Sequence, residues 1–370
     1  MNTAVVIRVD SSSQIGSGHL MRCLTLAGRL CGGADVHFIC RDIDGNLSRL
    51  VSEQGYDLIL LPRAERDDTL TGYAAWLTVP QEHDAADTIA AMAAHGLSHV
   101  DMLVVDSYAI DITWEKRLRT MASKIFVIDD LANRHHDCDI LLDANFYSDG
   151  GANRYDGLVP NQCKKLIGPQ YVLLRDEFYA VREKQPVRDG NIHRVLVFYG
   201  GSDMTDETTK AINAITKLKE NFRQGLMNDL CIDENFTADI IVGGSNSNAD
   251  KIKILCDAYD FLTYHFQVSN IAHMMAKADI MIGAGGTTTW ERCYMGLPAI
   301  VTAVADNQET DMDEYVRAGF IKYIGKSADV TSDTIIDALR NMTAEYLMNM
   351  SNKGQSMMSG NVRDLNVLEI

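Results

Sequence analysis

The sequence is short of positive charge. Its 370 residues include 34 lysines and arginines against 51 aspartates and glutamates, for a formal net charge of −17. An acidic excess of this size repels nucleic-acid backbones and anionic membranes, so we expect neither among its partners. A small diphosphate can still bind where backbone N–H groups and helix N-termini supply local positive potential, because salt screens distant charges within about 8–10 Å.

Long apolar runs are also absent. No stretch approaches the ~18 uninterrupted apolar residues of a membrane-spanning helix. The N-terminal segment MNTAVVIRVD enters a strand-like stretch without the basic and apolar regions of a secretory signal. We therefore expect a cytoplasmic protein, and we expect it to be a monomer.

No recognisable metal site or disulfide pattern is present. The eight cysteines are scattered, without a C-x-x-C pair or a zinc-binding spacing, which favours reduced core residues. Asp129-Asp130 and His135-His136-Asp137 suggest a metal at first sight, but adjacent histidines point in different directions on a helix or a strand. We expect no metal and no cofactor.

Proline is scarce, with 6 residues, whereas 46% of the chain is hydrophobic. A chain of 370 residues with this composition can bury two packed cores. Short apolar runs alternate with amphipathic ones, which is typical of parallel sheets flanked by helices. The polar segment KQPVRDGN at 184–191 interrupts this pattern. We predict two Rossmann-like, doubly wound α/β domains at 1–185 and 191–370 with a ligand cleft between them, and a C-terminal end that packs in the second domain or back on the first.

Eight strands and several helices can be assigned from the apolar pattern. The expected strands are Val5–Val9, Val36–Cys40, Met102–Asp106, Ile125–Ile128, Val195–Tyr199, Ile240–Val242, Ile280–Ile282 and Ala299–Thr302. Helical spacing recurs in Leu20–Leu30, Asp206–Leu218 and Ile271–Ala278. Because ligands of doubly wound sheets bind at the carboxyl ends of the strands, the turns after these strands are the places to look for a site.

The first such turn reads DSSSQIGSGH and joins a strand to a helix at residues 10–19. Gly16 and Gly18 let the backbone bend and approach a ligand, and His19 falls in the first turn of the helix. A helix N-terminus disfavours a charged imidazole, which helps His19 to accept a proton. A histidine that only packs at the start of a helix would give the same sequence pattern. Met21 stands where a dinucleotide fingerprint needs glycine, so no nicotinamide cofactor is expected.

A second glycine-rich turn, GAGGTTTWE at 283–291, also follows a strand and opens a helix. The N–H and hydroxyl donors of Gly285, Gly286, Thr287 and Thr288 form a plausible diphosphate cradle, and Glu291 could accept ribose hydroxyls. Two shorter motifs follow other strands, Gly200-Gly201-Ser202-Asp203 and Asp306-Asn307-Gln308. Each motif also has a purely structural interpretation as a tight turn or a helix cap. No G-x-x-x-x-G-K-[ST] segment occurs, which excludes an ordinary P-loop.

Taken together, these motifs resemble the nucleotide-sugar hydrolase family of pseudaminic acid biosynthesis. The most specific segment is SSSQIGSGHLMRC at 11–23. It is followed in the family's order by DSYAID, DDLANRHHDCDILLDAN, YDGLVP, LLRDEFY, YGGSD, GAGGTTTWE and DNQ. The family's LLDQN reads LLDAN here, so Ala144 removes an amide. The last segment, MSGNVRDLNVLEI, has no matching motif.

The resemblance implies a GT-B-like fold, similar to the peptidoglycan glycosyltransferase that uses UDP-N-acetylglucosamine. It implies hydrolysis of UDP-2,4-diacetamido-2,4,6-trideoxy-β-L-altropyranose to the free sugar and UDP, by metal-independent attack of water at C1 with inversion. The family's catalytic base falls on His19 and its cleft tyrosine on Tyr108. Implied nucleotide contacts are Gly201, Ser202, Gly286, Thr287, Glu291 and Asn307. With the turns above, the predicted substrate site adds Asp10, Gly16, Gly18, Arg22, Gly285, Thr288 and Gln308, and Asp10 is a candidate for orienting the His19 ring.

Three other functions remain open at this stage. A GT-B glycosyltransferase that passes the sugar to a hydroxyl acceptor would have the same donor site. A hydrolysing UDP-sugar 2-epimerase would share the two-domain architecture. A nucleotide-sugar sensor would bind UDP and release nothing. UDP release without an acceptor, and the C2 configuration of the product, would separate these functions.

Overall fold

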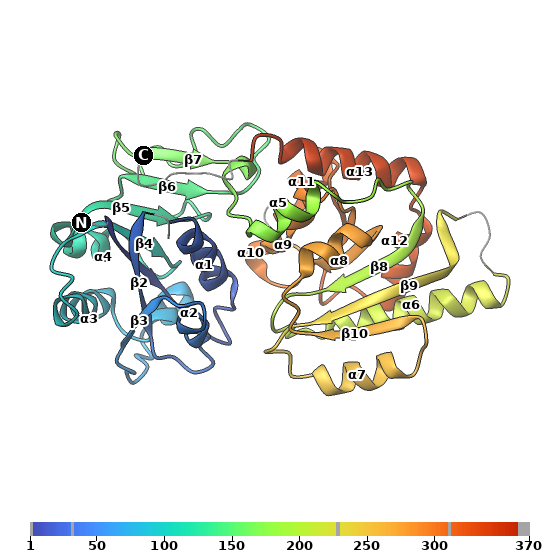
Figure 1. Cartoon of the computed structure of the whole chain (residues 1–370), viewed down its shortest axis with the longest axis horizontal. Helices are drawn as coiled ribbons and strands as arrows, with labels where there is room; N and C mark the ends of the chain where they lie inside the picture. The colour runs from blue at the N-terminus through green and yellow to red at the C-terminus, as the bar shows by residue number, and fades with distance from the viewer. Residues whose placement is uncertain (1–2, 31–32, 227–229, 310–311, 362–370) are drawn as a thin grey trace. The chain divides into compact units, whose positions relative to one another are not determined.

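A computed structural model describes residues 3–30, 33–226, 230–309 and 312–361. Contacts divide the chain into two units, which are considered separately below (Figure 1). Unit 1 runs to Leu173 and includes Asn361, whose amide donates to the carbonyls of Gln170 and Val172. Unit 2 comprises Leu174–Gly360. Within the described ranges, no helix has both the length and the apolar character needed to cross a bilayer.

Unit 1 is built on a seven-stranded sheet in which every pairing is parallel. Its strands are β1 (Thr3–Val9), β2 (Ala34–Arg41), β3 (Asp57–Leu61), β4 (Val100–Asp106), β5 (Ala122–Ile128), β6 (Ile140–Asp143) and β7 (Lys164–Ile167), in the order β3-β2-β1-β4-β5-β6-β7. Its helices are α1 (Gly18–Leu30), α2 (Arg49–Glu53), α3 (Gln81–Ala94) and α4 (Ile112–Leu118), with the 3₁₀ turns η1 (Gly72–Leu77), η2 (Arg119–Met121) and η3 (Pro169–Tyr171).

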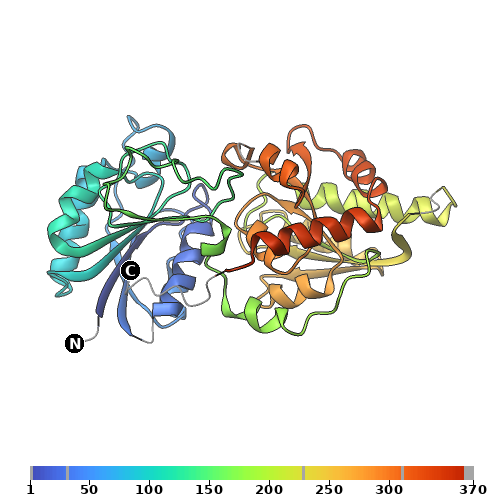
Figure 2. The same ribbon diagram turned by 90° about the horizontal axis from the view of Figure 1, so that it is seen from above.

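Helices cover both faces of this sheet, which explains its continuous apolar strands (Figure 2). Val5 and Ile7 pack with α1 and α2 on one face, whereas Val6 packs with α3 and α4 on the other. The largest fully buried side chain on the second face is Trp114 of α4. Unit 1 is therefore doubly wound, as predicted.

Unit 2 has a six-stranded parallel sheet in the order β10-β9-β8-β11-β12-β13. Its strands are β8 (Ile192–Phe198), β9 (Ile232–Val242), β10 (Leu262–Phe266), β11 (Ile280–Ala284), β12 (Ala299–Ala303) and β13 (Lys322–Lys326). Its helices are α5 (Asp176–Arg182), α6 (Glu207–Arg223), α7 (Ala249–Asp257), α8 (Ile271–Lys277), α9 (Thr288–Tyr294), α10 (Asp306–Glu309), α11 (Met312–Ala318), α12 (Ser332–Arg340) and α13 (Ala344–Met357). Helices α6, α7 and α12 close the core on one face.

The polar segment 184–191 is fixed in unit 2 by Arg188. Its partly buried guanidinium donates to four carbonyls at the ends of α8 and α9, those of Met275, Ala278, Met295 and Gly296, at 2.7–3.0 Å. Helix C-termini leave such carbonyls without intrahelical partners, so one cation satisfies two helices. Burial lowers the pKa of Arg188 to about 10, which leaves it charged at neutral pH. The contact boundary at Leu173 lies before α5, ahead of the predicted boundary, because α5 packs on α8 and α9.

Both sheets reverse their strand order at one point. In unit 1 the reversal lies between β1 and β4, and in unit 2 between β8 and β11. The segments after these strands diverge to opposite faces, which leaves a crevice at the carboxyl ends where ligands of doubly wound folds bind. The turns after β1 and β4, and after β8 and β11, are therefore the structural candidates for a site. They coincide with four of the motifs found in the sequence.

Candidate active site

The strand pairing of unit 1 brings the His19 turn next to the end of β4. Val9, the last residue of β1, is paired with Asp106, the last residue of β4. The turn after β1 is ordered: the Gly16 amide donates to the Ser12 carbonyl at 2.9 Å, and Gly16 has a φ of 79°, which suits glycine. Helix α1 then begins at Gly18, and His19 is its second residue. The prediction that His19 lies in the first helical turn is confirmed.

His19 forms a dyad with Asp106. Its Nδ1 lies 2.6 Å from Asp106 Oδ1, and the two side chains are 9% and 0% exposed. Because an ionised carboxylate can only accept, Nδ1 is the nitrogen that donates to Asp106, and in the neutral imidazole this leaves the lone pair on Nε2. The ring is thus held in the tautomer that can accept a proton at Nε2.

Arg22, one helical turn after His19, keeps Asp106 ionised. Its Nε and Nη2 lie 2.5 and 2.6 Å from the two carboxylate oxygens, a two-point contact. Burial by itself would raise the pKa of Asp106, but the Arg22 guanidinium and His19 outweigh it and hold that pKa well below its usual range. The predicted Arg22 is therefore in the site, in contact with the partner of His19.

The carboxylate that contacts His19 is Asp106 and not Asp10, the residue suggested from the sequence. Asp10 accepts from Arg8 Nη1 and from the backbone N–H of Arg41, both at 2.7 Å. It belongs to a buried ionic network centred on Asp84, which ties β1 and β2 to α3. The sequence alone does not give the order of the strands in the sheet, so it does not show that the end of β4 lies beside His19. That Asp10 binds substrate stays a prediction.

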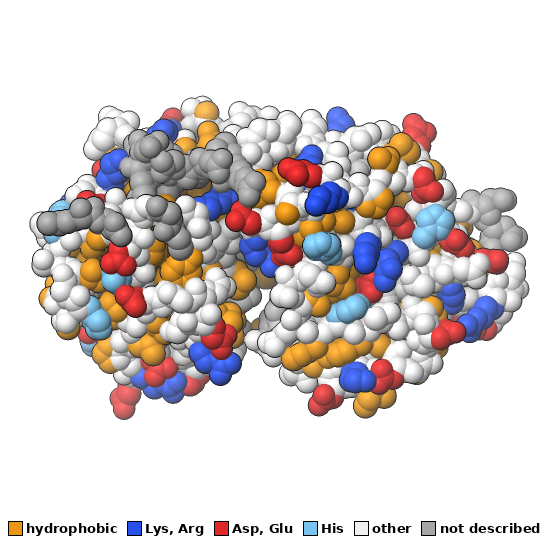
Figure 3. Space-filling view, in the orientation of Figure 1, with side chains coloured by type: hydrophobic (Ala, Val, Ile, Leu, Met, Phe, Trp, Pro, Cys, Tyr) orange, Lys and Arg blue, Asp and Glu red, His pale blue; other side chains and the backbone are white. Residues whose placement is uncertain are grey.

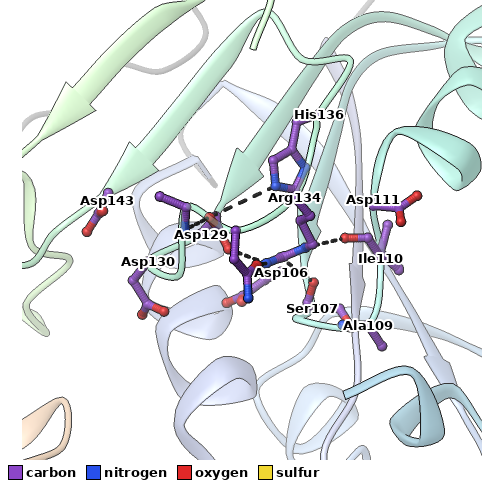
Figure 4. A network of polar contacts seen from close by, with 12 residues as sticks. Asp106, Ser107, Ala109, Ile110, Asp111, Asp129, Asp130, Arg134, His136 and Asp143 are labelled. Atoms are coloured by element: carbon purple, nitrogen blue, oxygen red, sulfur yellow. Dashed lines mark hydrogen bonds and ion pairs between the residues drawn. The ribbon is translucent and has the colours of Figure 1, made fainter. Parts of the chain in front are cut away.

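Tyr108 is held beside the dyad by the loop after β4. Its ring centroid lies 4.7 Å from that of His19, edge to face. Arg134 fixes this loop, because its Nε donates to the Ile110 carbonyl at 2.8 Å and its Nη2 to the Ser107 carbonyl at 3.1 Å (Figure 4). Burial and the neighbouring carboxylate of Asp130 raise the pKa of Tyr108, so its hydroxyl stays protonated. Arg134 was not predicted, although it lies within the segment DDLANRHHDCD.

Carboxylates gather at the ends of three neighbouring strands (Figure 4). Asp106 ends β4, Asp129 and Asp130 follow β5, and Asp143 ends β6. Asp143 is fully buried and accepts from the hydroxyl of Tyr155 at 3.0 Å. Burial and the charge of Asp130 raise the pKa of Asp143 to about 7. The carboxyl ends of these strands therefore hold Asp106, which stays ionised, and Asp143, which titrates near neutral pH.

His136, one of the two adjacent histidines that suggested a metal site, is paired with a carboxylate. His136 Nδ1 lies 2.7 Å from Glu115 Oε1 in a buried pair with side chains 1% and 0% exposed. A group of three side chains that could hold a metal ion occurs elsewhere in the described part of unit 1, at Asp35, His37 and Asp57. It lies at the amino ends of β2 and β3, at the opposite edge of the sheet from His19.

Unit 2 holds the predicted glycine turns. The turn after β8 presses against the one after β9, because a Cβ on Gly243 would lie 2.3 Å from the carbonyl oxygen of Gly201. After β11, Gly286 faces Gln308, whose amide nitrogen would lie 3.7 Å from a Cβ at that position. Thr287 is exposed and precedes α9. The turn of Gly201 and that of Gly286 thus follow the strands on either side of the reversal point.

Two acidic side chains of the unit 2 motifs, Asp203 and Glu291, have structural partners. Asp203 caps α6, since its carboxylate oxygens accept from the backbone N–H groups of Glu207 and Thr208 at 2.9 Å. Glu291 Oε1 accepts from Arg175 Nη2 at 3.1 Å. Ser202 and Gly285 lie in the two glycine turns, Thr288 is the first residue of α9, and all three are partly buried. Asn307 is in α10, but its side chain lies outside the described part of the structure.

Charged side chains of both signs are interspersed over the face drawn in Figure 3, and a single basic stripe is not seen there. The mixture of charges on this face is in line with the net charge of −17.

Comparisons with known proteins agree with this architecture. Residues 195–364 match the family model of the glycosyltransferase family 28 C-terminal domain. The sequence is 26% identical to the UDP-2,4-diacetamido-2,4,6-trideoxy-beta-L-altropyranose hydrolase of Campylobacter jejuni, over 85% of this chain and 97% of that protein. Among solved structures, MurG of Acinetobacter baumannii aligns with a TM-score of 0.61 at 15% identity, over 96% of this chain and 95% of that one. A UDP-glucosyltransferase from Polygonum tinctorium aligns with a TM-score of 0.66 at 14% identity, over 97% and 94%. The chain therefore has the two-domain GT-B fold, and the resemblance to the nucleotide-sugar hydrolase is confirmed over most of its length.

Proposed function

We propose that the protein is a nucleotide-sugar-processing enzyme that hydrolyses a UDP-linked deoxyamino sugar, with His19 as general base. The observation that carries this proposal is the His19–Asp106 dyad at the reversal point of unit 1. A histidine fixed with its proton on Nδ1 and a lone pair on Nε2 is suited to remove a proton from water. The similarity to the Campylobacter jejuni hydrolase supports UDP-2,4-diacetamido-2,4,6-trideoxy-β-L-altropyranose as the substrate.

In this mechanism His19 Nε2 accepts a proton from water as the water oxygen attacks C1 of the sugar. The C1–O bond breaks, and its electron pair leaves with the β-phosphate of UDP. Attack opposite the leaving group inverts the configuration at C1. The positive charge that His19 gains is stabilised by Asp106, which stays ionised because its pKa is low. The base contributes about 10²–10⁴-fold in rate.

Unit 2 is proposed to bind the UDP moiety. Its family 28 match includes the Gly201 and Gly286 turns, whose backbone N–H groups can donate to phosphate oxygens without a net charge of their own. Such donors stabilise the diphosphate more as its negative charge grows, so no acid and no metal is needed at the leaving group. Glu291 and Gln308 are proposed to contact the nucleoside.

The decisive experiment measures UDP release from the UDP-diacetamido sugar in H₂¹⁸O without an acceptor and with EDTA. We expect stoichiometric UDP and free sugar, ¹⁸O on the sugar, and an inverted anomer as the first product by NMR. Label on phosphate would instead indicate pyrophosphatase-type cleavage. His19→Ala should abolish turnover while UDP binding, measured by calorimetry, survives. Normal turnover by folded His19→Ala protein would refute the assignment of the base.

A glycosyltransferase is the second candidate, because the family 28 match and the MurG-like fold both favour it. That function predicts no UDP release until a hydroxyl acceptor is added. The same assay therefore separates the two functions. A 2-epimerase would also release UDP, but the free sugar would have a changed configuration at C2, and a sensor would release nothing.

A further inference from the structure

Two aromatic side chains that no motif predicted lie beside the dyad. They come from η1, where Trp76 has its ring centroid 6.0 Å from that of His19. Trp76 lies 5.5 Å from Tyr108 and 4.9 Å from Tyr73, and Tyr73 lies 5.1 Å from Tyr108, all between ring centroids. We refer to Tyr73, Trp76 and Tyr108 as the aromatic wall.

The aromatic wall lies at the border of the core of unit 1, where Tyr108 is buried and Trp76 packs against the core. Ala75 and Leu77 of η1 are buried, at 6% and 1% exposure, and anchor this short helix on the sheet. Trp76 and Tyr73, on the same turn, are only partly buried. The segment ends at Thr78 with a φ of 65°, a left-handed conformation that is unfavourable for a β-branched residue. The fold thus holds two large apolar rings, still partly open to solvent, next to the catalytic histidine.

The proposed reaction places the sugar close to these rings. A general base lies about 2.6–3.2 Å from the water it activates, and that water lies about 3–3.5 Å from the carbon it attacks. C1 is therefore within about 6–7 Å of His19 Nε2. The rings of Tyr108 and Trp76 are centred 4.7 and 6.0 Å from the centroid of the His19 ring, which is a similar range. A bound sugar with C1 in this position lies near the dyad, whose surroundings include these aromatic rings.

The chemistry of the rings selects among sugars. An aromatic face carries partial negative charge and attracts C–H groups, which are weakly positive and apolar. A 2,4-diacetamido-2,4,6-trideoxyhexose has a methyl group at C6 and two acetyl methyl groups, whereas N-acetylglucosamine has hydroxyls at C4 and C6. A hydroxyl placed against an aromatic ring loses its hydrogen bonds to water without gaining a partner.

We propose that Trp76, supported by Tyr73, is a specificity-determining residue that packs against the apolar substituents of a deoxyamino sugar and thereby favours it over fully hydroxylated UDP-sugars. This inference rests on the proposed function, because it takes His19 as the base that fixes the position of C1. It assigns to η1 a role that is separate from the chemistry of the dyad.

Binding to His19→Ala protein tests the proposal without turnover. Calorimetry would compare UDP, UDP-N-acetylglucosamine and the UDP-diacetamido-trideoxy sugar. We expect the deoxyamino sugar to bind about 10-fold or more tightly than UDP-N-acetylglucosamine, in the range of selectivity that apolar pockets give for small groups. Adding Trp76→Ala should abolish that preference and leave the affinity for UDP unchanged, while Trp76→Phe should retain most of it.

Trp114→Phe in the same His19→Ala background is the matched control. Trp114 is fully buried in the core of unit 1, where its Nε1 donates to Asp84 at 2.9 Å. This control should lower the melting temperature and keep the preference. A preference that survives Trp76→Ala, or that is missing from the parent, would overturn the role of the aromatic wall. Absence of UDP release by the wild-type enzyme would instead overturn the proposed hydrolysis, so the two failures are distinguishable.

Discussion

Replacement of Asp106 by asparagine separates the charge of the dyad from its shape. Oδ1 of Asp106 lies 2.6 Å from both His19 Nδ1 and Arg22 Nη2, and Oδ2 lies 2.5 Å from Arg22 Nε. All three neighbours donate hydrogen bonds. Asparagine has one oxygen and one NH₂ group, so either orientation of its amide sets a donor against a donor of Arg22. The variant keeps the volume of the side chain but cannot serve both partners.

Two separate losses should result from Asp106→Asn. The imidazole loses the acceptor that fixes its tautomer. The contribution of general-base catalysis to the rate, about 10²–10⁴-fold or about 3–5 kcal/mol of the activation barrier, should therefore be reduced. Folding also suffers, because removing one charge from a buried pair costs about 3–5 kcal/mol. The folding loss should be smaller here, since the Arg22 side chain is 19% exposed.

The loss of stability should depend on pH in a defined direction. The pKa of Asp106 is lower in the folded protein than in the unfolded chain, where it is about 3.9. Its ionised form therefore stabilises the fold above that pH, and this stabilisation is lost as the pH falls towards the folded pKa. The difference in unfolding free energy between wild type and Asp106→Asn should shrink accordingly below about pH 4.

The assay compares kcat, UDP affinity and denaturant unfolding for Asp106→Asn and for a matched control, Glu115→Gln. The control alters another buried carboxylate–imidazole pair of unit 1, in which Glu115 lies 2.7 Å from His136. We expect Glu115→Gln to lose stability and keep kcat, and Asp106→Asn to lose both while UDP still binds. A folded Asp106→Asn enzyme whose kcat stays within about threefold of wild type would refute the dyad.

Three other predictions concern the remaining features. Gly243→Ala should weaken UDP binding in calorimetry, because its Cβ would lie 2.3 Å from the Gly201 carbonyl oxygen; Gly244→Ala, which meets only the end of a flexible side chain, should bind UDP normally. Arg188→Met should lower the unfolding free energy in urea by about 2–4 kcal/mol, because four helix-end carbonyls lose their donor. The pKa of Asp143 is raised to about 7, so its stabilising protonated form is lost as the pH rises; unfolding at several pH values should show Asp143→Asn gaining on wild type by about 1.4 kcal/mol per pH unit between about 4 and 7.

The sequence predicts the central strands of both sheets but not most of the edge strands. All eight predicted strands are present, because strands buried on both faces read as apolar runs. The missed strands are β3, β6, β7, β10 and β13. Four of them, β3, β7, β10 and β13, are edge strands and have a neighbour on one side only. Edge strands such as KKLI and KYIGK carry charged residues that face solvent, so their pattern resembles that of loops.

The candidate site was also predictable only in part. His19 could be found because a glycine turn, a strand end and a helix start coincide within ten residues of sequence. Asp106 lies 87 residues further along the chain, and its contact with His19 depends on the pairing of β1 with β4. Its signal was present in the strand-ending segment DSYAID, but only strand order shows which strand end faces which helix. Trp76 had no such signal, because η1 follows neither a strand nor a glycine motif.

The contrast between the two reversal points supports the proposed division of roles. At the strand ends of unit 1 the described side chains include the carboxylates of Asp106, Asp130 and Asp143, with the Arg22 guanidinium on Asp106. In unit 2 the residues Gly200, Gly201 and Ser202 after β8, and 285–288 after β11, are small and uncharged. Two like charges 4 Å apart repel by about 4 kcal/mol at an effective dielectric constant of 20. A diphosphate placed next to these carboxylates would therefore be repelled by them. The same carboxylates favour the positive charge that His19 acquires when it takes a proton from water, so the electrostatics of unit 1 suit the base and those of unit 2 suit the leaving group.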